Sequence, residues 1–111
     1  ETPGSTSFSW QDCGDDGCVD VVFGDSVTPV SGPGFRYTED PARVADFRES
    51  LDRLAALPCQ VLIATHPELG GFWDRAAAPG GPERFIEPSG CRDYAALGHR
   101  RLDAVLKDEA E

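Results

Sequence analysis

Residues 57–67 read Leu-Pro-Cys-Gln-Val-Leu-Ile-Ala-Thr-His-Pro, and this stretch decides the fold. Val61 to Ala64 form a short continuous apolar run, which is typical of a strand that is covered on both faces. Pro58 ends the element that precedes the run. His66 follows the end of the strand, where α/β proteins place many of their functional groups. The stretch therefore predicts a buried strand with a chemically useful side chain just past its carboxyl end.

A helix is expected on each side of this strand. Before it, Asp40-Pro41 is typical of a helix start, with Asp as N-cap and Pro at the first helical position. Apolar residues follow at intervals of three and four, at Val44, Phe47, Leu51, Leu54 and Leu57. After the strand, residues 91–109 carry a second apolar stripe, with Ser89 or Gly90 as its cap. Between them, residues 68–78 allow a short helix before the Pro and Gly residues at 79–82 interrupt the chain.

The first third of the chain predicts a hairpin. Residues 6–10 alternate so that Phe8 and Trp10 share one face of a half-buried strand. Residues 12–17 turn the chain, and the β-branched run from Cys18 to Gly24 suits a second strand. The Gly- and Pro-rich residues 24–34 read as an ordered loop. The order strand, strand, helix, strand, helix predicts an α/β layer, with residues 1–111 as one domain or half of one.

Charge excludes some partners. The 10 Lys and Arg residues are outnumbered by 20 Asp and Glu residues, which gives a formal net charge of −10. A nucleic-acid duplex requires a basic surface, and an anionic membrane attracts one, so neither is an expected partner. No apolar run approaches the roughly 18 residues that a membrane-spanning helix needs.

The four cysteines indicate an oxidising compartment. Cys13 and Cys18 flank a turn-forming Gly-Asp-Asp-Gly sequence, and Cys59 and Cys91 form a distant pair. Neither pair has the CxxC spacing of a zinc knuckle or a redox motif. Of the three possible connectivities, 13 to 18 with 59 to 91 is favoured, because two antiparallel strands would bring the first two sulfurs together. Four buried free thiols are the alternative. Stable disulfides would place the chain in the periplasm or outside the cell.

Only His66 stands out as a candidate for chemistry, and its position fits either a metal ligand or a hydrogen-bonded structural histidine. His99, beside two arginines in the last expected helix, reads as a solvated surface residue. The two histidines are too far apart for a His-x-His zinc motif. A serine triad would need Ser and Asp near His66, and Asp25-Ser26 is available. No phosphate-binding loop or nucleophile elbow is present.

A series of short motifs resembles the C-terminal half of a metallo-β-lactamase of subclass B3. The motifs, in the order of that family, are Thr2-Pro3-Gly4-Ser5-Thr6-Ser7, Gly24-Asp25-Ser26-Val27, Leu57-Pro58-Cys59 and Thr65-His66-Pro67. Cys59 and Cys91 also lie where that subclass carries a disulfide. The resemblance spans nearly the whole chain.

The resemblance implies the C-terminal βα half of an αβ/βα sandwich, with two zinc ions in a groove at the edge of two sheets. The family hydrolyses the β-lactam amide, and its zinc lowers the pKa of water and polarises the carbonyl. His66 matches the histidine ligand of the second zinc. Ser26 and Thr28 match hydroxyl positions that contact zinc-bound water or the substrate carboxylate in relatives. Thr2 to Ser5 match the loop after a histidine ligand of the first zinc.

Two departures from the family pattern bear on function. The His-x-His-x-Asp-His ligand cluster belongs to the N-terminal half, which this chain lacks. Glu1 stands where relatives have a histidine, and it is either a replacement ligand or a terminal remnant. One ligand cannot hold a catalytic zinc, so the 111-residue chain alone is expected to be inactive and to need the missing half as its partner. The alternatives are a non-catalytic interaction module built on half of the sandwich, and an acidic, disulfide-stapled secreted protein without this chemistry.

Overall fold

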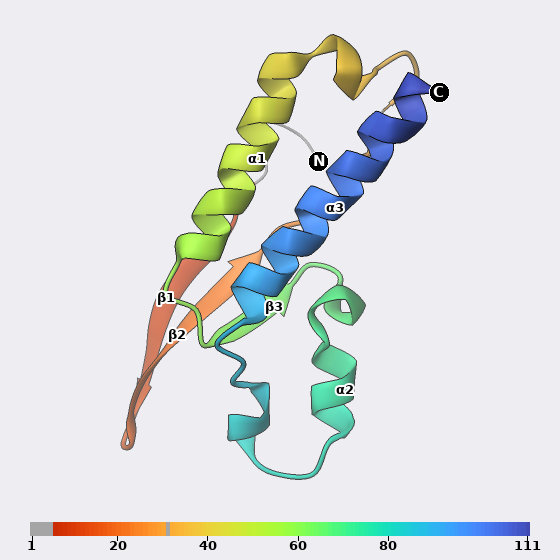
Figure 1. Ribbon diagram of the computed structural model, residues 1–111. Helices are drawn as coiled ribbons and strands as arrows, with labels where there is room; N and C mark the ends of the chain where they lie inside the picture. Colours follow the sequence, from red (N-terminus) through yellow and green to blue (C-terminus); the bar gives the residue numbers. More distant parts are fainter. Residues whose placement is uncertain (1–5, 31) are drawn as a thin grey trace.

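The computed structural model describes residues 6–30 and 32–111. Its strands and longer helices are β1 (Phe8–Gly14), β2 (Gly17–Gly24), α1 (Pro41–Ala56), β3 (Val61–Ala64), α2 (Phe72–Ala77) and α3 (Gly90–Ala110). Three single-turn 3-10 helices connect them, namely η1 (Tyr37–Glu39), η2 (Pro67–Gly70) and η3 (Pro82–Phe85). The expected order of hairpin, helix, strand and helix is confirmed (Figure 1).

The three strands form one sheet in the order β1-β2-β3. β1 and β2 are antiparallel, and a two-residue turn at Asp15-Asp16 joins them. This turn is tighter than the expected turn over residues 12–17, because β1 continues to Gly14. Gly17 has a φ of 114°, a conformation that glycine adopts without steric cost. β3 lies parallel to β2, so the crossover through α1 brings the carboxyl ends of both strands to one edge.

The two long helices begin as the sequence predicts, but by different means. Asp40 caps α1, since its Oδ1 accepts a hydrogen bond from the backbone N–H of Arg43 at 3.1 Å. Ser89 is the N-cap of α3, yet its hydroxyl makes no hydrogen bond to a helical N–H group. The Ser89 hydroxyl lies 2.8 Å from Oε1 of Glu87 and 2.9 Å from Oδ2 of Asp93 instead. The local sequence therefore placed both starts, although only α1 has a side-chain cap.

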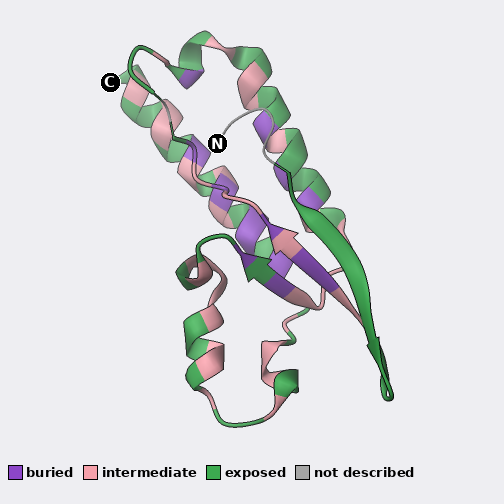
Figure 2. Ribbon diagram, turned by 180° about the vertical axis from the view of Figure 1, so that it is seen from behind, coloured by how far each residue is buried: buried purple, intermediate pink, exposed green. Residues whose placement is uncertain are grey.

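One core lies between the sheet and the pair α1 and α3. The helices run side by side over the same face of the sheet, and the buried residues gather between them and the strands (Figures 1 and 2). Val22 and Leu62 face this core from β2 and β3. The other buried members are Val27, Tyr37, Phe47, Leu51, Leu54, Ala64, Cys91, Tyr94, Ala95 and Leu102. The apolar stripes of both helices are thus confirmed as core faces.

The opposite face of the sheet is largely open among the described residues, although Val21 is buried on it, and this corrects two expectations. β3 is covered on one face only, because Leu62 and Ala64 are buried whereas Ile63 is 37% exposed. β1 is exposed along its whole length, with Phe8 at 60% and Trp10 at 46%. The pairing register aligns Phe8 and Ile63 with Phe23 of β2 in one row across this face. The physical reason is that both long helices pack on the other side.

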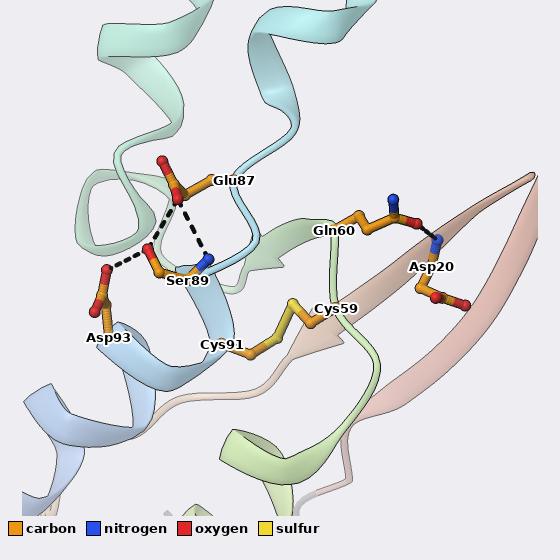
Figure 3. Close-up of a disulfide and its surroundings, with 7 residues drawn as sticks. All are labelled: Asp20, Cys59, Gln60, Glu87, Ser89, Cys91 and Asp93. Carbon is orange, nitrogen blue, oxygen red and sulfur yellow. Dashed lines mark hydrogen bonds between the residues drawn. A yellow bond between two sulfur atoms is a disulfide. The ribbon is translucent and has the colours of Figure 1, made fainter.

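Both expected disulfides are present, Cys13 with Cys18 and Cys59 with Cys91. The first joins the two strands at the tip of the hairpin, where both residues are exposed. The second ties Cys59, two residues before β3, to Cys91 in the first turn of α3 (Figure 3). No described cysteine is free. The disulfides thus fix the hairpin and the start of α3 relative to β3.

Candidate functional site

The carboxyl ends of β2 and β3 meet at one edge of the sheet. Gly24 pairs with Ala64 in the parallel register. Thr65 then donates twice to the carbonyl oxygen of Gly24, from its backbone N–H at 3.1 Å and from its hydroxyl at 3.0 Å. The loop that begins at Asp25 therefore leaves the sheet beside the segment that begins at His66. This edge is where α/β sheets place their ligands.

The His66 side chain lies outside the core. The residue has an extended backbone at the N-cap of η2, and its side chain is 54% exposed. Its Nδ1 lies 4.0 Å from Oε1 of Glu68, too far for a hydrogen bond. No other described side chain hydrogen-bonds to the ring. The geometry thus leaves both ring nitrogens of His66 available to an external partner, which a metal ligand requires.

Ser26 and Thr28 sit in a hydrogen-bonded turn just after β2. The Oδ1 of Asp25 accepts from the N–H of Ser26 at 2.7 Å, and the Oγ of Ser26 accepts from the N–H of Thr28 at 3.2 Å. All three residues are half-buried. The Ser26 hydroxyl oxygen therefore supports the turn and makes no described contact with His66, so these contacts do not form a serine triad.

Two residues of α3 hold this turn, and sequence reasoning missed both. The buried Tyr94 donates from its hydroxyl to the carbonyl oxygen of Asp25 at 3.0 Å. Arg101 donates from Nη1 to the Oγ1 of Thr28 at 2.7 Å. Tyr94 falls within the apolar stripe expected at residues 91–109, but nothing in a stripe shows which loop its hydroxyl reaches. Arg101 gave no signal, because an arginine in the middle of a helix is ordinarily a surface residue.

His99 is not the solvated surface residue that its sequence position predicts. Its side chain is 29% exposed and lies between α1 and α3. The Nε2 atom is 3.0 Å from Oδ1 of Asp52, and Nδ1 is 3.0 Å from Nη1 of Arg48. An arginine can only donate, so Nδ1 accepts and Nε2 carries the proton. His99 therefore links α1 to α3. Its described hydrogen bonds do not involve the residues at the sheet edge.

A hollow of about 290 Å³ opens between the loop after β2 and α1. Asp25 and Ser26 line it from the loop, and Ser50 and Leu54 line it from the helix. One side of the turn that carries Ser26 is therefore reachable by a small molecule or by another segment of polypeptide.

The described residues hold no group of three or more His, Cys, Asp or Glu side chains that could bind a metal ion. His66 fits as a single zinc ligand because its imidazole is accessible at the sheet edge, but one ligand is too few. Glu1 and the motif at residues 2–5 lie outside the described residues. Among the described helices, none is long and apolar enough to cross a membrane.

Comparison with known proteins identifies the fold. No family model matches the chain. The structure is similar to Rm3 metallo-β-lactamase, with a TM-score of 0.90 and 42% sequence identity over 99% of this chain. It is also similar to the metallo-β-lactamase SMB-1 in a complex with mercaptoacetic acid, with a TM-score of 0.86 and 38% identity over 93% of this chain.

A third similar structure is MEM-A1, described as a subclass B3 metallo-β-lactamase from a soil metagenome library, with a TM-score of 0.87 and 35% identity over 94% of this chain. The chain belongs to the subclass B3 metallo-β-lactamases. It spans only 41% to 43% of the length of these three structures. The three-stranded sheet and its helices thus match half of the metallo-β-lactamase fold, as the motifs predict.

Proposed function

We propose that this chain is the C-terminal half of a zinc-dependent β-lactam hydrolase and supplies one side of its active site. The observation that carries the proposal is the shared sheet edge, where Ser26 follows β2 and the exposed His66 follows β3. Identity of 35% to 42% with metallo-β-lactamases over nearly the whole chain supports the same conclusion. Because the chain spans less than half of those proteins, it is inactive alone in this proposal.

His66 is the zinc ligand in this proposal. Bound zinc lowers the pKa of water and polarises the carbonyl of the scissile amide. Two such ions serve the complete enzyme, and His66 contributes to the second one. The contacts between Thr65 and Gly24 hold the neighbouring residue to the end of β2, so the imidazole extends from a fixed point of the backbone. The remaining ligands come from the N-terminal half of the protein, with Glu1 as a candidate replacement for a histidine.

Ser26 and Thr28 bind the substrate in this proposal. A hydroxyl group donates to a carboxylate oxygen, and β-lactams carry a carboxylate that such donors can recognise. The Oγ of Ser26 accepts from the N–H of Thr28, and the Oγ1 of Thr28 accepts from Arg101, so both hydroxyl groups are held in place before substrate arrives. This arrangement reduces the conformational entropy that is lost when the substrate binds.

The open face of the sheet is the docking surface for the N-terminal half. Phe8, Phe23 and Ile63 form one apolar row on it, and Trp10 belongs to the next row. Apolar side chains in contiguous rows are stabilised by burial against a partner. The two disulfides fit an oxidising compartment, so we place the complete protein in the periplasm or outside the cell.

The same open face supports a second candidate, a non-catalytic interaction module that associates with itself. This alternative predicts association through the apolar rows and no stoichiometric zinc in the complete protein after dialysis. Metal analysis and measurement of the solution mass separate the two candidates.

The test uses the complete protein that contains this chain. We expect hydrolysis of at least one penicillin, cephalosporin or carbapenem, with about two zinc ions per molecule. His66→Ala should lower the zinc content to about one ion, because the second site loses a ligand while the first keeps its own. His99→Ala is the matched control and should leave zinc content unchanged. Zinc-loaded protein that hydrolyses no β-lactam would refute the function, and unchanged zinc content in His66→Ala would refute the ligand assignment.

A further inference from the structure

Helix α3 reaches the loop after β2 through a single charged side chain. Nη1 of Arg101 lies 2.7 Å from Oγ1 of Thr28, although 73 residues separate them in the sequence. Both residues are half-buried. A hydrogen bond from a guanidinium is stronger than one between neutral groups, and partial burial reduces competition from water.

The charge of Arg101 is directed at this hydroxyl group rather than at a carboxylate. Arg48 pairs with Asp103, and Arg53 pairs with Glu49. Within residues 6–30 and 32–111, Arg101 forms no ion pair. Among the described arginines without an ion pair, Arg75 and Arg84 donate to backbone carbonyl oxygens, whereas Arg101 donates to a side-chain hydroxyl group. The guanidinium of Arg101 is therefore bound to the loop after β2 through the Thr28 hydroxyl.

The contact also sets what the Thr28 hydroxyl can do. An arginine is donor-only, so the oxygen of Thr28 must accept from it. The hydroxyl hydrogen of Thr28 is then directed to a different partner, and the neighbouring positive charge makes it a better donor. A donor with this polarisation suits an anionic group such as a carboxylate.

Arg101 is the charged member of a set of anchors along this loop. Tyr94 fixes the carbonyl of Asp25, and the hydroxyl of Tyr37 donates to the carbonyl of Val30 at 3.1 Å. These two contacts hold the backbone on either side of the turn. Of these three anchors, only Arg101 reaches a side chain that the proposed function assigns to the substrate.

We propose that Arg101 is a positioning residue that orients the Thr28 hydroxyl as a hydrogen-bond donor to the carboxylate of the substrate. This inference rests on the proposed function. Arg101 itself makes no contact with substrate in this account, so its effect passes through Thr28. Substrate affinity should therefore depend on Arg101 more than the rate of the chemical step does.

The test is a double-mutant cycle in the complete enzyme. Arg101→Met should raise KM about tenfold and change kcat little, as expected for loss of a charge-assisted hydrogen bond that orients a binding group. Thr28→Val removes the acceptor and should raise KM by a similar factor. In the Thr28→Val background, Arg101→Met should add almost nothing, because both changes break the same interaction. Arg100→Met is the control for charge, since Arg100 is exposed at the preceding position of α3.

A second readout is independent of activity. The N–H groups of Ser26 and Thr28 are hydrogen-bonded within the turn, so their hydrogen exchange reports its opening. Arg101→Met and Thr28→Val should each speed this exchange about tenfold, and Arg100→Met should not. If Arg101→Met fails to fold, the exchange of Thr28→Val decides the inference.

The outcomes distinguish the two proposals. An active enzyme with an unchanged KM in Arg101→Met, or with additive effects in the cycle, would overturn the positioning role. If the complete protein hydrolyses no β-lactam, the proposed function fails, and exchange at Ser26 and Thr28 alone tests the anchor. Unchanged hydrogen exchange in both Arg101→Met and Thr28→Val would overturn the anchoring role of Arg101. Faster hydrogen exchange in both variants would support that role.

Discussion

Gly98 of α3 lies so close to Leu51 of α1 that a Cβ atom at position 98 would come within 2.6 Å of Cδ2 of Leu51. The same atom would lie 3.0 Å from Cβ of Val27, in the loop after β2. Both neighbours are buried. The absence of a side chain at Gly98 therefore lets the two long helices and the loop meet at one point.

Gly98→Ala should destabilise the complete protein by about 1 kcal/mol. Overpacking at a well-filled position costs roughly 1 to 3 kcal/mol, and the better helix propensity of alanine returns about 1 kcal/mol. Ala96→Gly, at an exposed position of the same helix, measures the propensity difference alone. Urea unfolding of both variants gives the packing cost by subtraction. A packing cost near zero would show that Leu51 and Val27 move apart freely.

The elements of this chain were predictable because their signals are local. Asp40-Pro41 and the apolar stripe that follows fix α1 with no reference to the rest of the chain. The turn at Asp15-Asp16 and the β-branched residues after it likewise fix the hairpin. The shared edge of Ser26 and His66 also follows, since a helical crossover makes β2 and β3 parallel.

The predictions that were wrong concern features that depend on contacts between distant segments. The apolar run at Val61 to Ala64 indicates burial, but it cannot show which face the chain's own helices cover. His99 and Arg101 read as surface residues because the register of α3 against α1 and the loop is not encoded in their neighbourhood. The metal-ligand role of His66 came from resemblance, and it stays a prediction.

The His99 bridge between α1 and α3 should contribute modestly to stability. His99→Ala removes the hydrogen bonds to Arg48 and Asp52, and we expect a loss of about 1 kcal/mol because the site is partly exposed. A cycle with Asp52→Ala should give a coupling energy of about 0.5 kcal/mol. Thermal unfolding measures both, with Arg100→Ala as the control. Full additivity of the two changes would mean that the contact adds no stability.

The two disulfides should differ in their contribution to stability. Cys59 and Cys91 are 32 residues apart, and Cys13 and Cys18 are five apart. The chain-entropy model gives about 3 to 4 kcal/mol for the first and about 2 kcal/mol for the second. Replacement of each pair by alanine, followed by urea unfolding, tests the order. A larger loss from the hairpin pair would contradict it.

The solvent exposure of the two disulfides predicts the order in which a reductant opens them. The hairpin pair is exposed at both residues, whereas Cys91 is only 1% exposed within the core. Thiol–disulfide exchange requires access to a sulfur atom, so a mild reductant should open the hairpin disulfide first. Thiol labelling followed by mass spectrometry identifies which pair reacts. Earlier labelling of Cys59 and Cys91 would show that the core opens more readily than the packing indicates.

Glu109 near the end of α3 gives the fold an acid-sensitive contact. Its carboxylate accepts from the N–H of Thr38 at 2.9 Å and from the N–H of Tyr37 at 3.1 Å. These hydrogen bonds, that from the Thr38 backbone first, hold the pKa of Glu109 below its ordinary value of 4.5. The ionised form is therefore stabilised by folding. Its contribution is complete above the unfolded pKa and disappears as the pH falls through the lower folded pKa.

Glu109→Gln should accordingly lower the melting temperature at neutral pH and lose this effect in acid. Measured between about pH 7 and pH 3, the difference from the parent protein should shrink as the carboxylate of the parent becomes protonated. Glu111→Gln, two residues further along, controls for the change in net charge. A difference that persists at low pH would mean that Glu109 stabilises the fold by packing, since protonation would then leave its contribution intact.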